Sequence, residues 1–223
     1  MIVVVNGGYR TGSTVVYNII GCLVEKAGIG RRAGLKDKSE VNRLIQASPE
    51  ATVVAKSHTW YPKESVPGHV RVVYTYRQDI RDCVASVLLI KPWTSAKALE
   101  NLVMTQCALT KHMSSFEGDA KVLSLEYSGF YRNNDDLAKR LAAFLQLDLT
   151  EADVLTVASQ WTIEEVLTKM RTMEGEMHSP SELRKNHVSA FQGRNGYWES
   201  ILTAEQIAMI EGYQRDPLPE WLP

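Results

Sequence analysis

A glycine-rich segment near the N-terminus has the composition of an anion-binding loop. It runs from Gly7 to Thr14, between a β-branched run at 2–5 and a helical apolar pattern that begins at Ser13. Glycines let backbone N–H groups turn towards an anion, and a helix N-terminus adds partial positive charge. The segment fits the triphosphate-binding pattern GxxxxGK[ST] at Gly7, Gly12 and Thr14, but Ser13 stands where that pattern has lysine.

The cation of this loop is instead Arg10, three residues before the missing lysine. We therefore expect the loop to hold a 5′-phosphate, without the residue that reaches the β- and γ-phosphates of ATP. This weakens a kinase interpretation. A glycine turn without a ligand is the alternative, although the hydroxyls of Thr11, Ser13 and Thr14 beside a cation exceed what a turn needs.

A second group, Lys56 and His58, follows a short apolar run at 52–55 that is typical of a buried strand. Residues two apart on a strand project to the same side, so a cation and a base would lie together at the strand's carboxyl end. His58 is the side chain best placed to take a proton near neutral pH. The pair suits attack by a hydroxyl or an amine on an anionic group. Taken alone, a histidine is more often a surface or satisfied core residue.

A third group combines an arginine at the end of a strand with a serine in the next helix. Arg77 follows the Val- and Tyr-rich run at 70–76, and Ser86 lies in the helical segment 79–89. The planar guanidinium suits phosphate, so the two residues could bind a second phosphate away from the glycine loop. Two separate phosphate sites imply a ligand that is phosphorylated at two places.

The elements that must position these groups alternate between strand and helix. Apolar patterns predict strands at 2–5, 52–55, 70–76 and 121–126, and helices at 13–26, 39–47 with Ser39 as N-cap, 79–89, 95–116 and 135–145. Within the third of these helices, we interpret Arg81 and Asp82 as a structural pair at the helix terminus. Such alternation predicts an α/β fold with a central parallel β-sheet flanked by helices, whose ligands bind at the carboxyl ends of the strands.

The last third of the chain has a weaker pattern. Residues 173–189 are typical of a mobile loop, order returns at 193–198, a helix follows at 203–213, and the proline-rich tail 216–223 is expected to be extended. With 223 residues, 44% apolar and 23% charged, the composition fits one globular domain spanning 1–223.

Charge and cysteine usage exclude several classes of function. The net charge of −1 argues against nucleic-acid binding driven by bulk charge. No apolar run reaches the ~20 residues that cross a bilayer, and no signal peptide is evident. The three cysteines are odd in number and lack metal-ligand spacing, which predicts reduced thiols, no metal site and a cytoplasmic protein. They are Cys22, Cys83 and Cys107.

On these motifs the chain resembles the soluble sulfotransferases that use 3′-phosphoadenosine 5′-phosphosulfate (PAPS), which have a P-loop nucleotide-kinase-like fold. The family's first motif is a strand followed by a loop such as PKSGT, and here Arg10 takes the place of its basic residue. The resemblance implies contact with the 5′-phosphosulfate by Arg10, Thr11, Gly12, Ser13 and Thr14.

The family's catalytic histidine lies in a segment such as KTHLP, which is Lys56-Ser57-His58-Thr59-Trp60 here. The resemblance implies that His58 is the general base, with Lys56 and Arg10 as catalytic cations. The family's 3′-phosphate motif, such as RNPRDVVAS, is similar to the segment from Arg77 to Ser86, with a spacing one residue longer.

Three later segments extend the resemblance. The strand VLSLEY at 122–127 implies nucleotide contact by Tyr127, Trp161-Thr162 implies adenine contact by Thr162, and 193–198 resembles the RKGxxGDW segment over the 3′-phosphate. The Arg-Lys pair of that segment is replaced by Phe191-Gln192. The cation would then come from Arg194, or from Arg184 and Lys185. The dimer segment also differs at 199–204, so the oligomeric state stays open.

The activity implied is metal-free transfer of a sulfuryl group from PAPS to a hydroxyl or amine of a small-molecule acceptor. Two alternatives stay open: a P-loop kinase of a small metabolite, and a non-catalytic nucleotide-binding module. The chain is shorter than most animal members of the family, which favours a bacterial small-molecule enzyme. Acceptor pockets are expected from 60–64, 93–104 and 173–187, with Trp60, Tyr61, Trp93 and Met104 as candidate lining residues.

Overall fold

The computed structural model describes residues 1–59, 66–90, 95–114, 116, 118–175, 177–178, 181–185, 188 and 192–215. Its centre is a parallel five-stranded sheet with the strand order β2-β3-β1-β4-β5. The strands are β1 (Ile2–Gly7), β2 (Gly30–Leu35), β3 (Thr52–Ser57), β4 (Val70–Tyr76) and β5 (Val122–Glu126). The predicted α/β class with a central parallel sheet is therefore confirmed.

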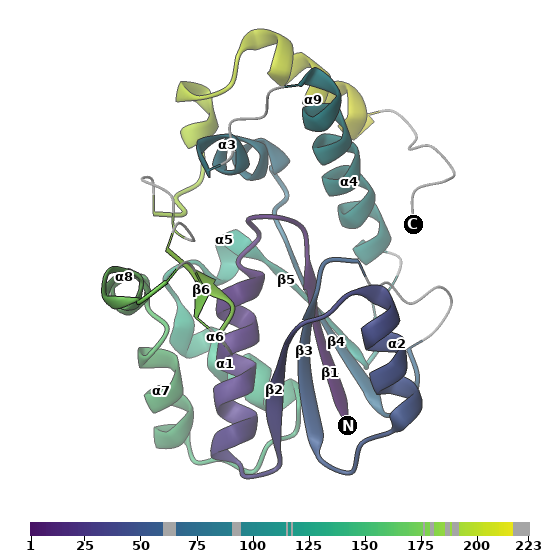
Figure 1. Ribbon diagram of the computed structural model, residues 1–223, viewed down its shortest axis with the longest axis vertical. Coiled ribbons are helices and arrows are strands. Elements are labelled where there is room, and N and C mark those ends of the chain that lie inside the picture. The colour runs from purple at the N-terminus through teal and green to yellow at the C-terminus, as the bar shows by residue number, and fades with distance from the viewer. Residues whose placement is uncertain are drawn as a thin grey trace.

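Helices cover both faces of this sheet (Figure 1). One face is covered by α1 (Ser13–Lys26), α6 (Asn134–Phe144), α7 (Glu151–Ser159) and α8 (Ile163–Thr172). The other face is covered by α2 (Lys38–Ala47) and the C-terminal half of α4 (Ala96–Ser114). A short helix, α5 (Tyr127–Phe130), follows β5 directly.

A third group of helices lies beyond the carboxyl ends of the strands, at the top of Figure 1. It consists of α3 (Ile80–Ile90), the first half of α4, the short 3-10 helix η1 (Tyr197–Ser200) and α9 (Ala204–Arg215). These elements share their own buried cluster, in which Val84, Val103 and Ile210 have no exposed surface. The molecule therefore has a helical tier above the edge of the sheet where ligands of such folds bind.

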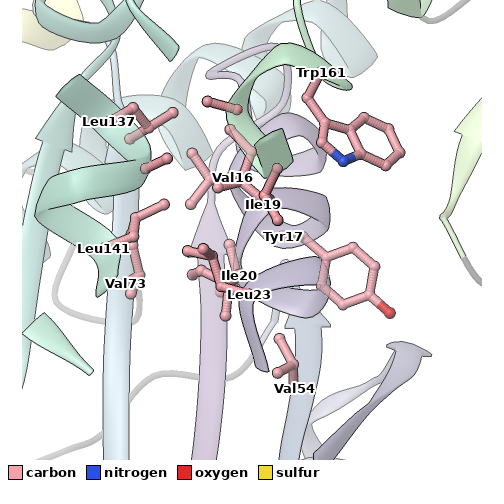
Figure 2. Close-up of a cluster of buried hydrophobic side chains, with 14 of the residues drawn as sticks. Val16, Tyr17, Ile19, Ile20, Leu23, Val54, Val73, Leu137, Leu141 and Trp161 are labelled. Atoms are coloured by element: carbon pink, nitrogen blue, oxygen red, sulfur yellow. The ribbon is translucent and has the colours of Figure 1, made fainter. Parts of the chain in front are cut away.

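The larger hydrophobic core lies on the sheet face that α1, α6, α7 and α8 cover, and it is built around α1 (Figure 2). Its apolar residues recur at the spacing of one helix face and are completely buried, as the sequence predicts: Val16, Ile19, Ile20, Leu23 and Val24. They pack between β1 and β3 of the sheet and the apolar side of α6, where Leu137 and Leu141 are also fully buried. This packing fixes the N-terminus of α1 at the end of β1.

The register of the strands brings the three predicted groups of site residues to the same edge of the sheet. Gly7 is paired with Thr75, and Asn6 with Ser57, so β1, β3 and β4 end side by side. The glycine loop, His58 and Arg77 each follow one of these ends. Residues that are far apart in sequence are therefore neighbours at the carboxyl edge.

The four predicted strands and six predicted helices are present, with boundaries within two residues of those expected. The N-cap of α2 is a correction. It is Asp37 instead of Ser39, because Asp37 Oδ1 accepts the backbone N–H of Glu40 at 2.8 Å and Glu40 Oε2 accepts that of Asp37 at 2.9 Å. This reciprocal capping box satisfies two helix-terminal donors, and the Ser39 hydroxyl donates to the same Asp37 Oδ1 at 2.8 Å.

Several elements were not among those predicted. β2 carries two glycines, two arginines and no β-branched residue, since it is a half-exposed edge strand. α7 and α8 begin at Thr150 and Thr162, whose hydroxyls accept the backbone N–H three residues on, a signal that the sequence does contain. Within 173–189, β6 (Met177–His178) and β7 (Leu183–Arg184) form an antiparallel pair.

The mobility expected for residues 173–189 stays a prediction, and the tail 216–223 lies outside the described residues. The three cysteines are free thiols, and Cys83 and Cys107 are buried. Burial raises the pKa of Cys83 to about 12 and that of Cys107 to about 11. Within the described part of the chain, no helix has the length and apolar character needed to span a membrane.

We predict that Ile20→Ala lowers the free energy of unfolding by about 2–5 kcal/mol, because it leaves a cavity under the sheet. The matched control is Leu89→Ala in α3, where the leucine is 42% exposed and the expected change is within about 0.5 kcal/mol. Urea unfolding followed by circular dichroism measures both. Equal losses in the two variants would show that α1 does not form the core.

Candidate active site

The start of the glycine loop is packed so closely that it has no room for side chains. A Cβ at Gly7 would lie 2.1 Å from Thr75 Oγ1, and one at Gly8 would lie 1.9 Å from Gln106 Oε1. Thr11 is buried beneath the loop, where its hydroxyl donates to the Gly8 carbonyl at 2.9 Å and lies 2.8 Å from Thr75 Oγ1. Thr11 therefore holds the loop and does not line the cavity above it.

The N-terminus of α1 opens from this loop. Its N-cap, Gly12, has φ +82° and no side chain to cap the first N–H groups. Those donors, together with the hydroxyls of Ser13 and Thr14, face a cavity of about 420 Å³ at the carboxyl edge of the sheet. Uncapped helix N-termini bind anions because unpaired N–H groups and the helix dipole act together.

Lys56 also lines this cavity. It belongs to β3, its side chain is almost completely buried, and Nζ donates to Thr14 Oγ1 at 2.8 Å. Burial lowers its pKa to about 8, with further lowering by Arg184 and Arg10 and an opposing effect of Glu182. A lysine with so low a pKa gains stability as an ammonium when an anion binds beside it.

His58 lies beside Lys56, as the strand alternation predicts, and both line the cavity. Its Nδ1 is 2.7 Å from the Gly7 carbonyl, and its ring stacks on Tyr9 with 5.3 Å between centroids. Because a carbonyl only accepts, Nδ1 carries the proton and Nε2 keeps its lone pair. Burial and then the charge of Lys56 lower the pKa of His58 to about 4, so the ring is neutral at neutral pH and its Nε2 is unprotonated.

Arg10 lines the cavity and contacts the helix that follows β4. Its backbone has φ +67°, and its Nε donates to Ser86 Oγ at 2.7 Å. The guanidinium therefore contacts α3 through Ser86. Burial lowers the pKa of Arg10, and the nearby charge of Arg77 lowers it further. Two cationic groups result: Lys56 with Thr14, and Arg10 with Ser86.

Arg77 is buried behind the second group, with only 4% of its surface exposed. Nε donates to the Arg10 carbonyl at 3.1 Å, Nη1 to Asn195 Oδ1 at 3.0 Å and Nη2 to the Gly193 carbonyl at 3.2 Å. The guanidinium also lies 3.8 Å from the centre of the Tyr127 ring. Protein groups thus meet most of its donors, while Arg77, Ser86, Tyr127 and Gly193 all line the cavity.

Asp82 holds the C-terminal segment against this site. Its carboxylate accepts the N–H of Gly196 at 2.8 Å and that of Trp198 at 3.4 Å, and it lies 3.5 Å from Arg77 Nη1. The predicted pairing of Arg81 with Asp82 is therefore wrong. Arg81 pairs with Asp79 at 2.8 Å and with Glu211 at 3.3 Å instead.

An apolar wall closes the side of the cavity near α5 and α8. It is formed by Val15, Phe130, Trp161, Ile163, Val166 and Val188. Thr162 is not part of it, since its hydroxyl caps α8 by accepting the N–H of Glu165. Arg194 is exposed and does not line the cavity, whereas Arg184 does. Met104 also lies away from it, and Trp60, Tyr61 and Trp93 are outside the described residues.

Some residues of the site were not predicted from the sequence, among them Tyr9, Gln106, Arg132 and Glu182. Tyr9 stacks on His58, and Gln106 from α4 donates to the Tyr9 carbonyl at 3.1 Å. Arg132 lines the cavity and donates to Gln192 Oε1 at 3.3 Å, and Glu182 lines it near Lys56. No sequence motif marks these residues. Arg132 and Glu182 adopt positive φ, but this feature is seen only in the structure and not in the sequence.

Comparison with known structures agrees with this architecture. Two structures of retinol dehydratase are similar, one with androsterone and inactive cofactor PAP (TM-score 0.63) and one with retinol and PAP (TM-score 0.64). Each is 16% identical, over 98% of this chain and 81% of the other. Mouse sulfotransferase SULT7A1 complexed with PAP is 14% identical, with a TM-score of 0.61 over 96% of this chain and 82% of the other.

No protein-family model matches the chain, and no curated protein matches it in sequence. The structural likeness shows that this chain has the sulfotransferase fold, as its motifs predict. The roles of its individual residues rest on the geometry above.

We predict that Lys56→Met raises the pKa of His58, because the variant removes the second cause of its lowering. In the wild type, NMR titration of the imidazole should place the midpoint near pH 4. The control is His112, whose pKa is lowered by burial alone, so that its midpoint should not change in the variant. An unchanged His58 midpoint would show that the ammonium does not act on the ring.

Proposed function

We propose that this protein is a PAPS-dependent sulfotransferase that transfers a sulfuryl group to a hydroxyl or amine of a small molecule. The observation that carries the proposal is one cavity with two separate cation–hydroxyl groups, Lys56 with Thr14 and Arg10 with Ser86. A nucleotide phosphorylated at one position needs only one of them. The proposed domain spans residues 1–223.

The two groups fit the two ends of the donor. The N–H groups at the start of α1, with Ser13 and Thr14, would hold the 5′-phosphosulfate as a helix N-terminus holds phosphate. Arg10 and Ser86 would bind the 3′-phosphate, since a guanidinium and a hydroxyl suit phosphate oxygens. Arg77 would support them from behind through the Arg10 carbonyl. Arg194, exposed beside Gly193, is the cation proposed to close over that phosphate.

The apolar wall fits the base of the donor. Trp161 and Phe130 offer flat faces for adenine, and Tyr127 lines the cavity beside Arg77. We assign the adenine contact to Trp161 and keep Thr162 as the residue that positions it through the cap of α8. Both crystallised relatives were solved with PAP, which agrees with an adenine nucleotide in this fold.

His58 would act as general base through Nε2. It takes the proton of the acceptor as the new bond from acceptor oxygen or nitrogen to sulfur forms and the bond from sulfur to the bridging oxygen breaks. PAP is then the leaving group. Lys56 and the loop N–H groups stabilise the charge that develops on the bridging oxygen. The Gly7 carbonyl keeps the His58 ring in the tautomer that this step needs.

The proposal predicts that PAP binds without magnesium and more tightly than AMP, which lacks the 3′-phosphate. Ser86→Ala and Arg10→Met should each weaken PAP binding about 10- to 100-fold, because each removes a charge-assisted contact to phosphate, and should leave AMP binding unchanged. Isothermal calorimetry measures both, with the exposed Arg140→Met as control. Preference for ATP with magnesium would favour a kinase.

A second prediction concerns His58→Ala. Turnover of PAPS with an acceptor should fall about 10²- to 10⁴-fold, because the base is lost, while PAP affinity is retained. Assays of PAP release and calorimetry on the same preparation separate the two quantities. His69→Ala is the matched control, since His69 is exposed and contacts the Ile45 carbonyl outside the cavity. Loss of PAP binding in His58→Ala would contradict the role of a base.

A further inference from the structure

Glu182 is the one carboxylate among the described residues that line the cavity. The other charged residues there are cations: Arg10, Lys56, Arg77, Arg132 and Arg184. A PAPS molecule is anionic at both ends, so a carboxylate would repel it. An acid in this position therefore needs another explanation.

The surroundings of Glu182 hold its carboxylate in place. Its backbone lies in the left-handed region, at φ +54°, which is costly for a residue other than glycine. Oε1 accepts the backbone N–H of Leu35 at 3.2 Å. That N–H directly follows a bulge in β2 between Arg32 and Gly34, and Gly34 has φ +79°. Bulges next to active sites often re-aim a group.

The bulge also makes room for the carboxylate. A Cβ at Gly34 would lie 2.9 Å from Glu182 Oε1. The Gly34 N–H donates to the buried Tyr17 hydroxyl at 2.8 Å, which fixes the bulge from the α1 side. Left-handed backbone at Gly34 and at Glu182, which are distant in sequence, thus holds the Glu182 carboxylate where this residue lines the cavity. Within the described structure Glu182 forms no ion pair.

Sheet order places Glu182 on the side left for the acceptor. The groups assigned to the 3′-phosphate, Arg10 and Ser86, follow β1 and β4, whereas Lys56 and His58, which are assigned to the transferring group, belong to the end of β3. Leu35 ends β2, which lies beyond β3 at the sheet edge, and Glu182 is bonded to it. In-line transfer requires the acceptor to approach from the side opposite the leaving PAP. Glu182 is close enough to Lys56 to affect its pKa.

We infer that the acceptor carries an ammonium group in addition to its nucleophilic hydroxyl, and that Glu182 binds this ammonium. The hydroxyl reacts at His58, because an ammonium has no lone pair for attack. The acceptor class is therefore amino alcohols and amine-bearing phenols. This inference rests on the proposed sulfotransferase function and names the substrate class of the same cavity.

The test is acceptor binding to the PAP-loaded protein, measured by calorimetry with matched pairs of probes. The pairs are tyramine with 4-propylphenol, and choline with 3,3-dimethylbutanol, which differ mainly in charge. Each cation should bind about 10-fold or more tightly than its uncharged partner. Glu182→Gln, which still accepts the Leu35 N–H, should weaken binding of the cations about 10- to 100-fold and leave the uncharged probes unchanged.

Controls separate charge from structure. Glu50→Gln, at an exposed carboxylate between α2 and β3, should change nothing. Gly34→Ala should reproduce the effect of Glu182→Gln, because its Cβ displaces the carboxylate. Thermal melting shows whether each variant is folded. PAP affinity should be retained or increased in Glu182→Gln, since that variant removes a negative charge that repels the anionic nucleotide.

The inference is overturned if PAP binds but the cations do not bind more tightly than their uncharged partners. It is equally overturned if Glu182→Gln weakens charged and uncharged probes alike, which is the result that a purely structural role predicts. Failure of the wild-type protein to bind PAP would instead contradict the proposed function itself.

Discussion

The buried guanidinium of Arg77 is the interaction on which the site depends. An arginine in the interior is tolerated only if its charge and its donors are met, because leaving them unpaired costs several kcal/mol. Here four partner groups come from three segments of the chain: the Arg10 carbonyl from the glycine loop, Asp82 from α3, and the Gly193 carbonyl and Asn195 amide from the C-terminal segment. The glycine loop, β4, α3 and the C-terminal segment are thus joined at one point. The same contact fixes the backbone at Arg10, whose side chain then reaches Ser86.

Burial at this edge also sets the chemistry. Lys56 and His58 are both less basic than in water, because the charged form of each is poorly solvated there. For His58 the lowered pKa means that stability is lost as the pH falls from the unfolded value near 6.5 towards 4, because only the unfolded chain takes up the proton easily. An anion bound beside Lys56 and His58 would stabilise their charged forms and so raise both pKa values again. The free protein therefore holds a neutral base ready for use beside a cation that gains from anion binding.

Much of this arrangement could be predicted from the sequence. The strands at 2–5, 52–55 and 70–76 are dense in apolar residues because they are central in the sheet, so their ends place the loop, His58 and Arg77 correctly. β2 could not be predicted in this way, since an edge strand with a bulge needs no apolar pattern. The direction of the Arg10 side chain and the place of Glu182 depend on left-handed backbone at each residue, which follows from tertiary contacts and leaves no local pattern. By contrast, Thr150 and Thr162 are local signals in the sequence that mark the starts of α7 and α8.

The most direct test of the account is a crystal structure of the complex with PAP. We predict that the 5′-phosphate lies over the N-terminus of α1, and that the 3′-phosphate accepts hydrogen bonds from the Arg10 guanidinium and the Ser86 hydroxyl. Arg77 should keep its bonds to Gly193 and Asn195. A complex in which the 3′-phosphate contacts neither Arg10 nor Ser86 would contradict the central claim that this cavity is built for a nucleotide phosphorylated at two positions.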